Sequence, residues 1–216
     1  MDADIGDVLG LVRERQRRLP APTRTLPPKH QPQMLLIGCI DARVDPNADL
    51  GMRRGDALIY RNPAALVRPY EDKGEEGGNR TMAGTLEFAV DTMGVKHIVV
   101  MGHTHCGAIN ACQCGVDHST HPNLYKYLKP LLDLVGLDKF KYATDEEHLR
   151  VLEQQGVRES VKNLMSYPPV AKAVQAGKLK IHGWVIDIAT HRIAELDHGN
   201  GQFVPMAPLG KGQGKG

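Results

Sequence analysis

The chain has 216 residues, of which 41% are apolar, 24% are charged and 5% are aromatic, and its net charge is +2. With about 150 residues as a typical domain, this length fits one domain with appendages and is enough to bury a hydrophobic core. Basic and acidic residues are interspersed, so nucleic acid and anionic membrane surfaces are not expected as partners. The longest apolar runs fall far short of the roughly 20 residues of a transmembrane helix, so no membrane span is expected.

The start of the chain and its cysteines indicate a compartment. Met1 is not followed by a basic segment and then an apolar one, so no secretory signal is expected. Four cysteines, three of them between Cys106 and Cys114, are too few for a disulfide framework in a chain of this size. Free thiols suit a reducing compartment and indicate metal binding or catalysis. We therefore expect a cytoplasmic protein.

An amphipathic helix is predicted at the N-terminus, over residues 2–19. Its apolar stripe consists of Ile5, Val8, Leu9 and Val12. Because an isolated helix of this length is marginal in water, the stripe has to pack on the core or on another subunit. A proline-rich linker follows, which is not helical. Residues 1–33 are therefore predicted to form an N-terminal helical arm and linker.

Short apolar runs alternate with helical periodicity from Met34 onward. Strands are predicted at four such runs, residues 34–37, 58–60, 97–101 and 181–188. Helices are predicted where apolar residues recur at helical spacing, over residues 82–93 and 149–165. An exposed loop rich in glycine and charge is predicted over residues 68–80.

This alternation predicts an α/β fold with a mostly parallel central sheet flanked by helices. The α/β domain is expected over residues 34–198. From Gly199 the sequence carries six glycines and no apolar periodicity, so residues 199–216 are predicted to form a flexible tail.

Two clusters of chemically versatile residues each follow a predicted buried strand. Cys39 follows the first strand, and His103 and Cys106 follow the third. Because ligands of open α/β sheets gather at the carboxyl ends of strands, these three side chains can meet around one ion. Two thiolates and one imidazole are typical zinc ligands and leave a fourth coordination position free, as in catalytic sites. The alternative is that Cys39 is a small buried apolar residue and His103 a hydrogen-bonded core histidine.

An acidic and a basic residue lie beside the first candidate ligand. Asp41 and Arg43 are two residues apart, so in an extended segment they project to the same side and can pair. Next to a metal ion, Asp41 either accepts a hydrogen bond from bound hydroxide or becomes the fourth ligand. Arg43 would decide between these roles by holding the carboxylate away from the ion. Without a metal, the two residues are an ordinary surface ion pair that contributes about 0 to 1 kcal/mol.

The motif Cys-x-Asp-x-Arg followed by His-x-x-Cys-Gly resembles the zinc-site signature of the beta-class carbonic anhydrases. The likeness covers most of the chain from Met34 to about Asp197. The resemblance implies Zn²⁺ bound by Cys39, His103 and Cys106, with the Asp41–Arg43 pair beside it as catalytic residues. It further implies reversible hydration of carbon dioxide to bicarbonate. The implied assembly is a homodimer or a higher homo-oligomer, with the N-terminal helix reaching onto a neighbour.

Three positions depart from the commonest family pattern, and they concern the substrate. Ala42, Ala65 and Ala108 stand where many members carry serine, asparagine and glycine. A lost hydroxyl, a lost amide and an added methyl group near the site can narrow or dry the substrate channel. The alternative function is therefore hydrolysis of carbonyl sulfide or carbon disulfide on the same zinc site.

Other functions remain compatible with the residues. The chain can be a zinc-holding scaffold without turnover, or a hydrolase with Cys39 as nucleophile and His103 as base. His105 is a candidate proton carrier. Cys112 and Cys114 could form a second metal site, with histidines 118 and 121 as the nearby partners. The favoured interpretation is that both cysteines are ordinary thiols.

Overall fold

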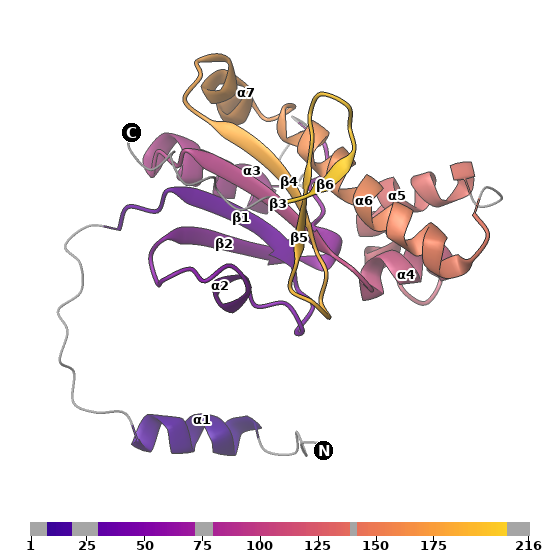
Figure 1. Ribbon diagram of the computed structural model, residues 1–216, viewed down its shortest axis with the longest axis horizontal. Coiled ribbons are helices and arrows are strands. Elements are labelled where there is room, and N and C mark those ends of the chain that lie inside the picture. Colours follow the sequence, from indigo (N-terminus) through magenta and orange to yellow (C-terminus); the bar gives the residue numbers. More distant parts are fainter. Residues whose placement is uncertain (1–7, 19–29, 72–79, 139–141, 207–216) are drawn as a thin grey trace. The chain divides into compact units, whose positions relative to one another are not determined.

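The computed structural model describes residues 8–18, 30–71, 80–138 and 142–206. The chain forms two compact units, Met1–His30 and Gln31–Gly216. The first unit holds helix α1, Val8–Arg17, with Arg15 and Arg17 in its last turn (Figure 1). The predicted N-terminal helix is therefore present over these residues. Ile5 of its predicted stripe and most of the predicted linker lie outside the described residues.

The second unit is built on a six-stranded sheet in the order β2-β1-β3-β4-β5-β6 (Figure 1). The strands are β1 Met34–Cys39, β2 Ala57–Asn62, β3 His97–His103, β4 Lys180–Ile186, β5 Ile193–Leu196 and β6 Phe203–Pro205. The first four are parallel to one another, and β5 and β6 pair antiparallel. The mostly parallel sheet is thus confirmed, and β1 and β3, about 60 residues apart in sequence, are direct neighbours.

Helices connect the strands and cover the sheet. They are α2 Pro46–Asp49, α3 Arg80–Glu87, α4 Gly107–Cys114, α5 Pro122–Asp138, α6 Asp145–Leu164 and α7 Pro168–Gln175, with a 3₁₀ turn η2 Pro63–Ala65 and a π-helical continuation of α3, η3 Phe88–Thr92. The helix predicted over 82–93 corresponds to α3 with η3, and the one over 149–165 to α6. Thr144 caps α6 by accepting a hydrogen bond from the backbone of Glu147, and acidic residues in the first turn suit its dipole.

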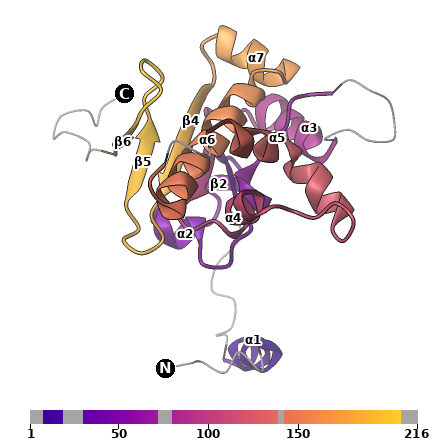
Figure 2. The same ribbon diagram turned by 90° about the vertical axis from the view of Figure 1, so that its right-hand side faces the viewer.

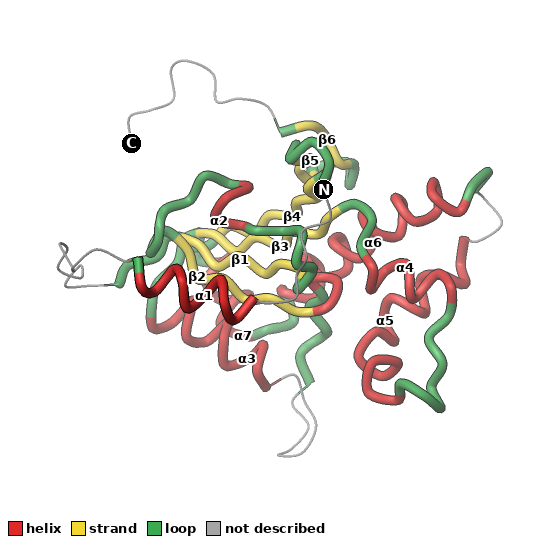
Figure 3. Tube along the Cα trace, turned by 90° about the horizontal axis from the view of Figure 1, so that it is seen from below, coloured by secondary structure: helices red, strands yellow, loops and turns green. Residues whose placement is uncertain are grey.

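The two faces of the sheet are covered unequally. Helices α3, α6 and α7 pack on one face and enclose the main core, to which β1 and β3 contribute alternate residues such as Leu35 and Val100 (Figure 2). The other face carries a smaller apolar cluster, centred on Leu36, Val99 and Met101. Helices α4 and α5 lie beyond the carboxyl ends of the parallel strands, and the N-terminal half of α6 packs with them (Figure 3). The loops after β1 and β3 therefore lie next to these helices.

Close packing of α6 on the sheet depends on a glycine in β4. A Cβ atom on Gly183 would lie 3.0 Å from Val157, 3.1 Å from Val161 and 3.2 Å from Leu196. Only glycine lets the helix approach this closely.

The predicted C-terminal tail differs from the structure. Residues Phe203–Pro205 form β6 and pair with β5, and the backbone N–H of Met206 donates to the carbonyl of Ile193 at 2.9 Å. The sheet therefore extends beyond the predicted boundary at residue 198, because backbone pairing supplies order that composition does not reveal. Residues 207–216, and residues 72–79 of the predicted loop, lie outside the described part of the chain. In the part that is described, no helix combines the length and hydropathy of a transmembrane span.

Candidate metal centre at the carboxyl ends of the strands

Three candidate ligands converge where β1 and β3 end. Cys39 is the last residue of β1, His103 is the last of β3, and Cys106 directly precedes α4. One ligand atom from each lies within 4.8 Å of the other two, and all three residues are buried. The sulfur atoms of Cys39 and Cys106 are 3.9 Å apart and form no disulfide. The structure thus brings together the three residues that the sequence indicated, because the strands that end in Cys39 and His103 are parallel neighbours.

The imidazole of His103 is held in one orientation. Its Nδ1 lies 2.9 Å from the backbone carbonyl oxygen of Thr104, to which it donates. Its Nε2 is buried and has no hydrogen-bond partner. A buried polar atom without a partner is costly. Donation by Nδ1 leaves the lone pair on Nε2, which is the usual arrangement of a metal-binding histidine.

The charge state of the cluster suits a cation. A hydrogen bond from the Cys106 thiol lowers the pKa of Cys39 to about 4, against the opposing effect of burial. The shared proton, together with burial, raises the pKa of Cys106. For His103, burial acts to lower the pKa, but the nearby sulfur of Cys39 and its negative charge outweigh burial, so the pKa is raised. Without a metal, Cys39 is therefore the thiolate of the cysteine pair, and Cys106 keeps the shared proton.

Asp41 is bound at both carboxylate oxygens by one neighbour. Arg43 donates from Nε to Oδ1 at 2.9 Å and from a terminal nitrogen to Oδ2 at 2.7 Å, and its backbone N–H donates to Oδ1 at 3.0 Å. These hydrogen bonds hold the pKa of Asp41 well below its usual range. The same terminal nitrogen also donates to the carbonyl oxygen of His105 at 2.9 Å. Oδ2 of Asp41 lies 3.8 Å from Nε2 of His103, so the carboxylate is next to the cluster.

Arg61 of β2 fixes the loop that carries Cys39 and Asp41. Its Nε donates to the carbonyl oxygen of Cys39 at 2.7 Å, and a terminal nitrogen donates to those of Asp41 and Val44 at 2.7 and 2.9 Å. The sequence pattern gave Arg61 no such role. The pairing of β2 with β1 places it there, since Arg61 lies opposite Gly38.

Glu153 of α6 supports the other loop. Its Oε1 accepts a hydrogen bond from the backbone N–H of Cys106 at 2.9 Å, and its Oε2 accepts one from Arg150 at 2.8 Å. Burial raises the pKa of this carboxyl group. Neither residue was predicted, because charged residues in a long, mostly polar helix are usually solvent-exposed. No local sequence signal distinguishes them.

Other candidates lie apart from the cluster. The ring of His105 faces Arg150, whose terminal nitrogen is 2.6 Å from its Nε2. Cys112 is buried, which raises the pKa of its thiol to about 12, whereas Cys114 is exposed. Within the described ranges, the cluster of Cys39, His103 and Cys106 is the only His, Cys, Asp or Glu group suited to an ion, so a second metal site at Cys112 and Cys114 is not found.

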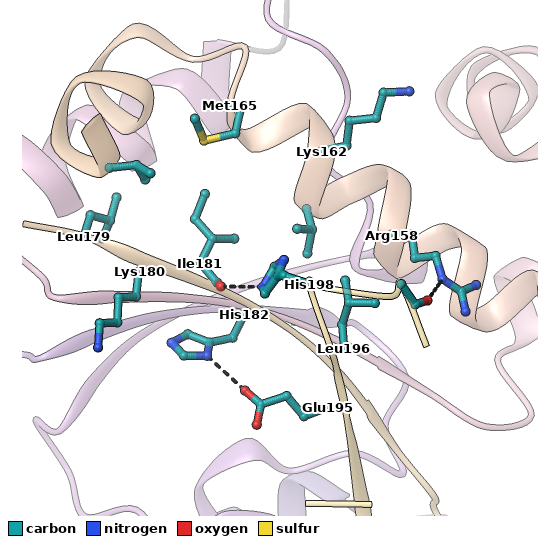
Figure 4. Close-up of a pocket in the computed structure, with 13 residues that line it drawn as sticks. Arg158, Lys162, Met165, Leu179, Lys180, Ile181, His182, Glu195, Leu196 and His198 are labelled. Carbon is teal, nitrogen blue, oxygen red and sulfur yellow. Dashed lines mark hydrogen bonds and ion pairs between the residues drawn. The ribbon is translucent and has the colours of Figure 1, made fainter. Parts of the chain in front are cut away.

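The pocket in Figure 4 lies elsewhere in the fold. It has a volume of about 790 Å³ and is formed by α6, α7, the start of β4 and the β5–β6 region. Its wall includes Met165, Leu179 and Ile181, with Arg158 and Glu195 at the sides. None of the cluster residues lines it. The candidate chemistry is therefore at the carboxyl ends of the parallel strands and not in this pocket.

The fold and the cluster define an α/β protein with a candidate two-cysteine, one-histidine metal centre at the ends of its parallel strands. Residues 34–193 match the family model described as carbonic anhydrase. The chain belongs to the beta-carbonic anhydrase family, as the Cys-x-Asp-x-Arg and His-x-x-Cys-Gly motifs indicated.

Two curated relatives and one set of solved structures illustrate the similarity. The chain is 31% identical over 185 residues to a carbonic anhydrase of Pseudomonas aeruginosa, which covers 85% of this chain and 82% of the relative. It is 34% identical over 179 residues to beta carbonic anhydrase 6, mitochondrial, of Arabidopsis thaliana, covering 79% of this chain but 59% of that protein. Its fold is similar to that of tetrameric beta-carbonic anhydrases from Sordaria macrospora, with a TM-score of 0.70, 28% identity, and coverage of 83% of this chain and 84% of that chain.

Proposed function

We propose that the protein is a zinc lyase that interconverts carbon dioxide and bicarbonate. The observation that carries the proposal is the convergence of one ligand atom each from Cys39, His103 and Cys106 within 4.8 Å, beside an arginine-bound Asp41. Membership of the beta-carbonic anhydrase family supports the same reaction.

Zinc fits these residues. Cys39, His103 and Cys106 would hold the ion, and it would give the unpartnered Nε2 of His103 a partner. A divalent cation would also compensate two buried thiolates, and this ligand set is typical of zinc. Bound zinc supplies hydroxide near neutral pH, because it lowers the pKa of a coordinated water from about 15.7 toward about 7.

Asp41 and Arg43 have complementary roles in the proposal. An ionised carboxylate can only accept hydrogen bonds. Asp41 therefore orients the attacking nucleophile by accepting a hydrogen bond from its O–H group. Arg43 occupies both oxygens of Asp41 and keeps the carboxylate in place. With Asp41 bound by Arg43 in this way, Cys39, His103 and Cys106 are the residues that would hold zinc, and Asp41 would stay beside the ion rather than bind it.

Carbon dioxide is favoured over carbonyl sulfide and carbon disulfide as the substrate. The relatives and the family model all carry the name carbonic anhydrase. Parallel assays with the three gases distinguish the substrates, and we expect the highest kcat/KM with carbon dioxide.

We further propose a cytoplasmic homo-oligomer in which the arm over residues 1–33 reaches a neighbouring subunit. On the less covered face of the sheet, Ile59 and Val204 are 37% and 45% exposed, and a second copy would bury them. The similar Sordaria macrospora enzymes are tetrameric. The four free thiols suit a reducing compartment. Light scattering of the purified chain tests the assembly, and a monomeric mass would contradict it.

Zinc content measured together with stopped-flow hydration of carbon dioxide tests the function. We expect about one zinc per chain and rapid hydration. Asp41→Asn should keep the zinc but lose about 100-fold or more in kcat. If the protein binds zinc but does not hydrate carbon dioxide, the proposal is wrong and the result supports a zinc-holding scaffold without turnover. Turnover that survives removal of zinc by a chelator would support Cys39 as a nucleophile instead.

A further inference from the structure

The peptide bond between His105 and Cys106 is held at both ends by side chains from distant elements. Its carbonyl oxygen accepts a hydrogen bond from Arg43 at 2.9 Å, and its N–H donates to Oε1 of Glu153 at 2.9 Å. The C=O and N–H of one trans peptide point in opposite directions. A guanidinium on one side and a carboxylate on the other therefore fix the orientation of the peptide plane.

This peptide needs support because of the backbone conformation of His105. Its φ is 54°, in the left-handed region that is unfavourable for residues with a Cβ atom. Such conformations persist only where the surrounding contacts determine them. Arg150 supplies a further contact, since one terminal nitrogen lies 2.6 Å from Nε2 of His105 and the other donates to Oε2 of Glu153 at 2.8 Å.

Glu153 is buried and binds the His105–Cys106 peptide from α6. Its side chain is 1% exposed, so a change in its hydrogen bonds is not compensated by water. One oxygen binds the peptide and the other binds Arg150, so both are used. On the other side of the peptide, Arg43 connects directly to the two oxygens of Asp41. A continuous chain of hydrogen bonds thus joins α6 to the carboxylate beside the metal cluster.

We propose that Glu153 and Arg150 are positioning residues, which hold the His105–Cys106 peptide so that Arg43 keeps Asp41 in its working orientation. The inference rests on the proposed function and names further residues on which that reaction depends. Neither residue contacts the reacting atoms. If the peptide rotates, Arg43 loses its carbonyl acceptor, and the two-point contact with Asp41 is no longer fixed.

The first test compares three variants by stopped-flow hydration of carbon dioxide and zinc content. Glu153→Met fills a similar volume without an acceptor oxygen, and we expect kcat to fall about 10- to 100-fold with zinc content and KM unchanged. Glu153→Gln keeps an acceptor and should recover most of the rate. Glu146→Gln is the matched control, because Glu146 also lies 3.4 Å from Arg150 but is 72% exposed. It should leave kcat unchanged. Equal losses in Glu153→Met and Glu153→Gln would overturn the proposal.

A double-mutant cycle tests whether the effect passes through Arg43. In an Arg43→Ala background, Glu153→Met should change kcat by less than about twofold, since the residue on which it acts is already absent. Independent, multiplying losses would overturn the inference. If Glu153→Met does not fold, Arg150→Met takes its place in the same cycle with the same expectation, because the Arg150 side chain is 28% exposed and its loss leaves a smaller buried defect.

A crystal structure gives a readout that does not depend on turnover. In the Glu153→Met protein we expect a rotated His105–Cys106 peptide and a broken contact between Arg43 and Asp41. An unchanged peptide and an intact contact would overturn the inference. If the zinc-loaded wild-type chain does not hydrate carbon dioxide, the proposed function fails, whereas this structural comparison still tests the role of Glu153.

Discussion

Arg43 and Asp41 are joined by two side-chain hydrogen bonds, of 2.9 and 2.7 Å, that together use both carboxylate oxygens. Such a two-point contact fixes the plane of the carboxylate as well as its position. The Asp41 side chain is 15% exposed and that of Arg43 54%, so the arginine screens the carboxylate from solvent on one side. An aspartate held in this way can accept one further hydrogen bond in a defined direction.

Arg43→Lys is expected to reduce kcat about 10- to 100-fold with zinc content unchanged. A lysine ammonium is a compact charge that cannot bind both carboxylate oxygens in a planar fork, so Asp41 is free to turn toward the metal ligands. Stopped-flow kinetics measure the rate, and the absorption spectrum of the cobalt-substituted protein reports the change in coordination. Arg53→Lys is the control, because Arg53 forms an exposed ion pair with Asp56. Full activity in Arg43→Lys would contradict the role of the two-point contact.

Cys39→Ser is expected to lower the zinc content from about one ion per chain to below about a tenth, since serine is a poor zinc ligand. Cys114→Ser should keep its zinc, because Cys114 is exposed and lies outside the cluster. Metal analysis after extensive dialysis measures both. Retention of zinc by Cys39→Ser would show that Cys39 is not a ligand, and loss from Cys114→Ser would indicate a second site.

Zinc binding to the metal-free protein at pH 6 is expected to release about two protons. Bound ligands are deprotonated, but Cys39, with its pKa lowered to about 4 by the hydrogen bond from Cys106, has lost its proton before zinc arrives. Cys106 and His103, whose pKa values are raised, each carry one proton to release. Calorimetry in two buffers of different ionisation enthalpy counts the protons. Release of about three would mean that the two thiols have ordinary pKa values.

Gly183→Ala is expected to lower the free energy of unfolding by about 1–3 kcal/mol. The added methyl group would meet Val157, Val161 and Leu196 at 3.0 to 3.2 Å, so α6 has to move off the sheet. Gly84→Ala in α3 is the opposite control, because nothing lies within 4 Å of its Cβ position. There alanine should stabilise the helix by roughly 0.5–1 kcal/mol. Denaturant unfolding of both variants checks the two signs.

The ligand cluster and the central sheet could be predicted because both depend on short-range patterns. Apolar runs mark buried parallel strands, and Cys39 and His103 each stand at the end of such a run. Once β1 and β3 are neighbours, their ends have to meet. The Asp41–Arg43 contact is also local, since the two residues are only two positions apart.

The supporting residues could not be predicted, because their roles depend on tertiary placement. Glu153 lies 47 positions from the backbone N–H that it binds, and Arg61 lies 22 positions from the Cys39 carbonyl. A glutamate in a helix rich in charged residues gives no local sign that it faces inward. Strand β6 was missed for a related reason: three residues are too short to show periodicity, and they are ordered by pairing with β5.

The two edges of the sheet differ in their capacity to recruit further strands. At one edge, β6 has only three residues and ends in Pro205, which lacks a backbone donor, so this side terminates growth. At the other edge, no strand in the described ranges pairs with the outer side of β2, which spans six residues. Aggregation of partly unfolded chains by strand addition should therefore start at β2, and a proline introduced there on the outward-facing backbone would protect against it.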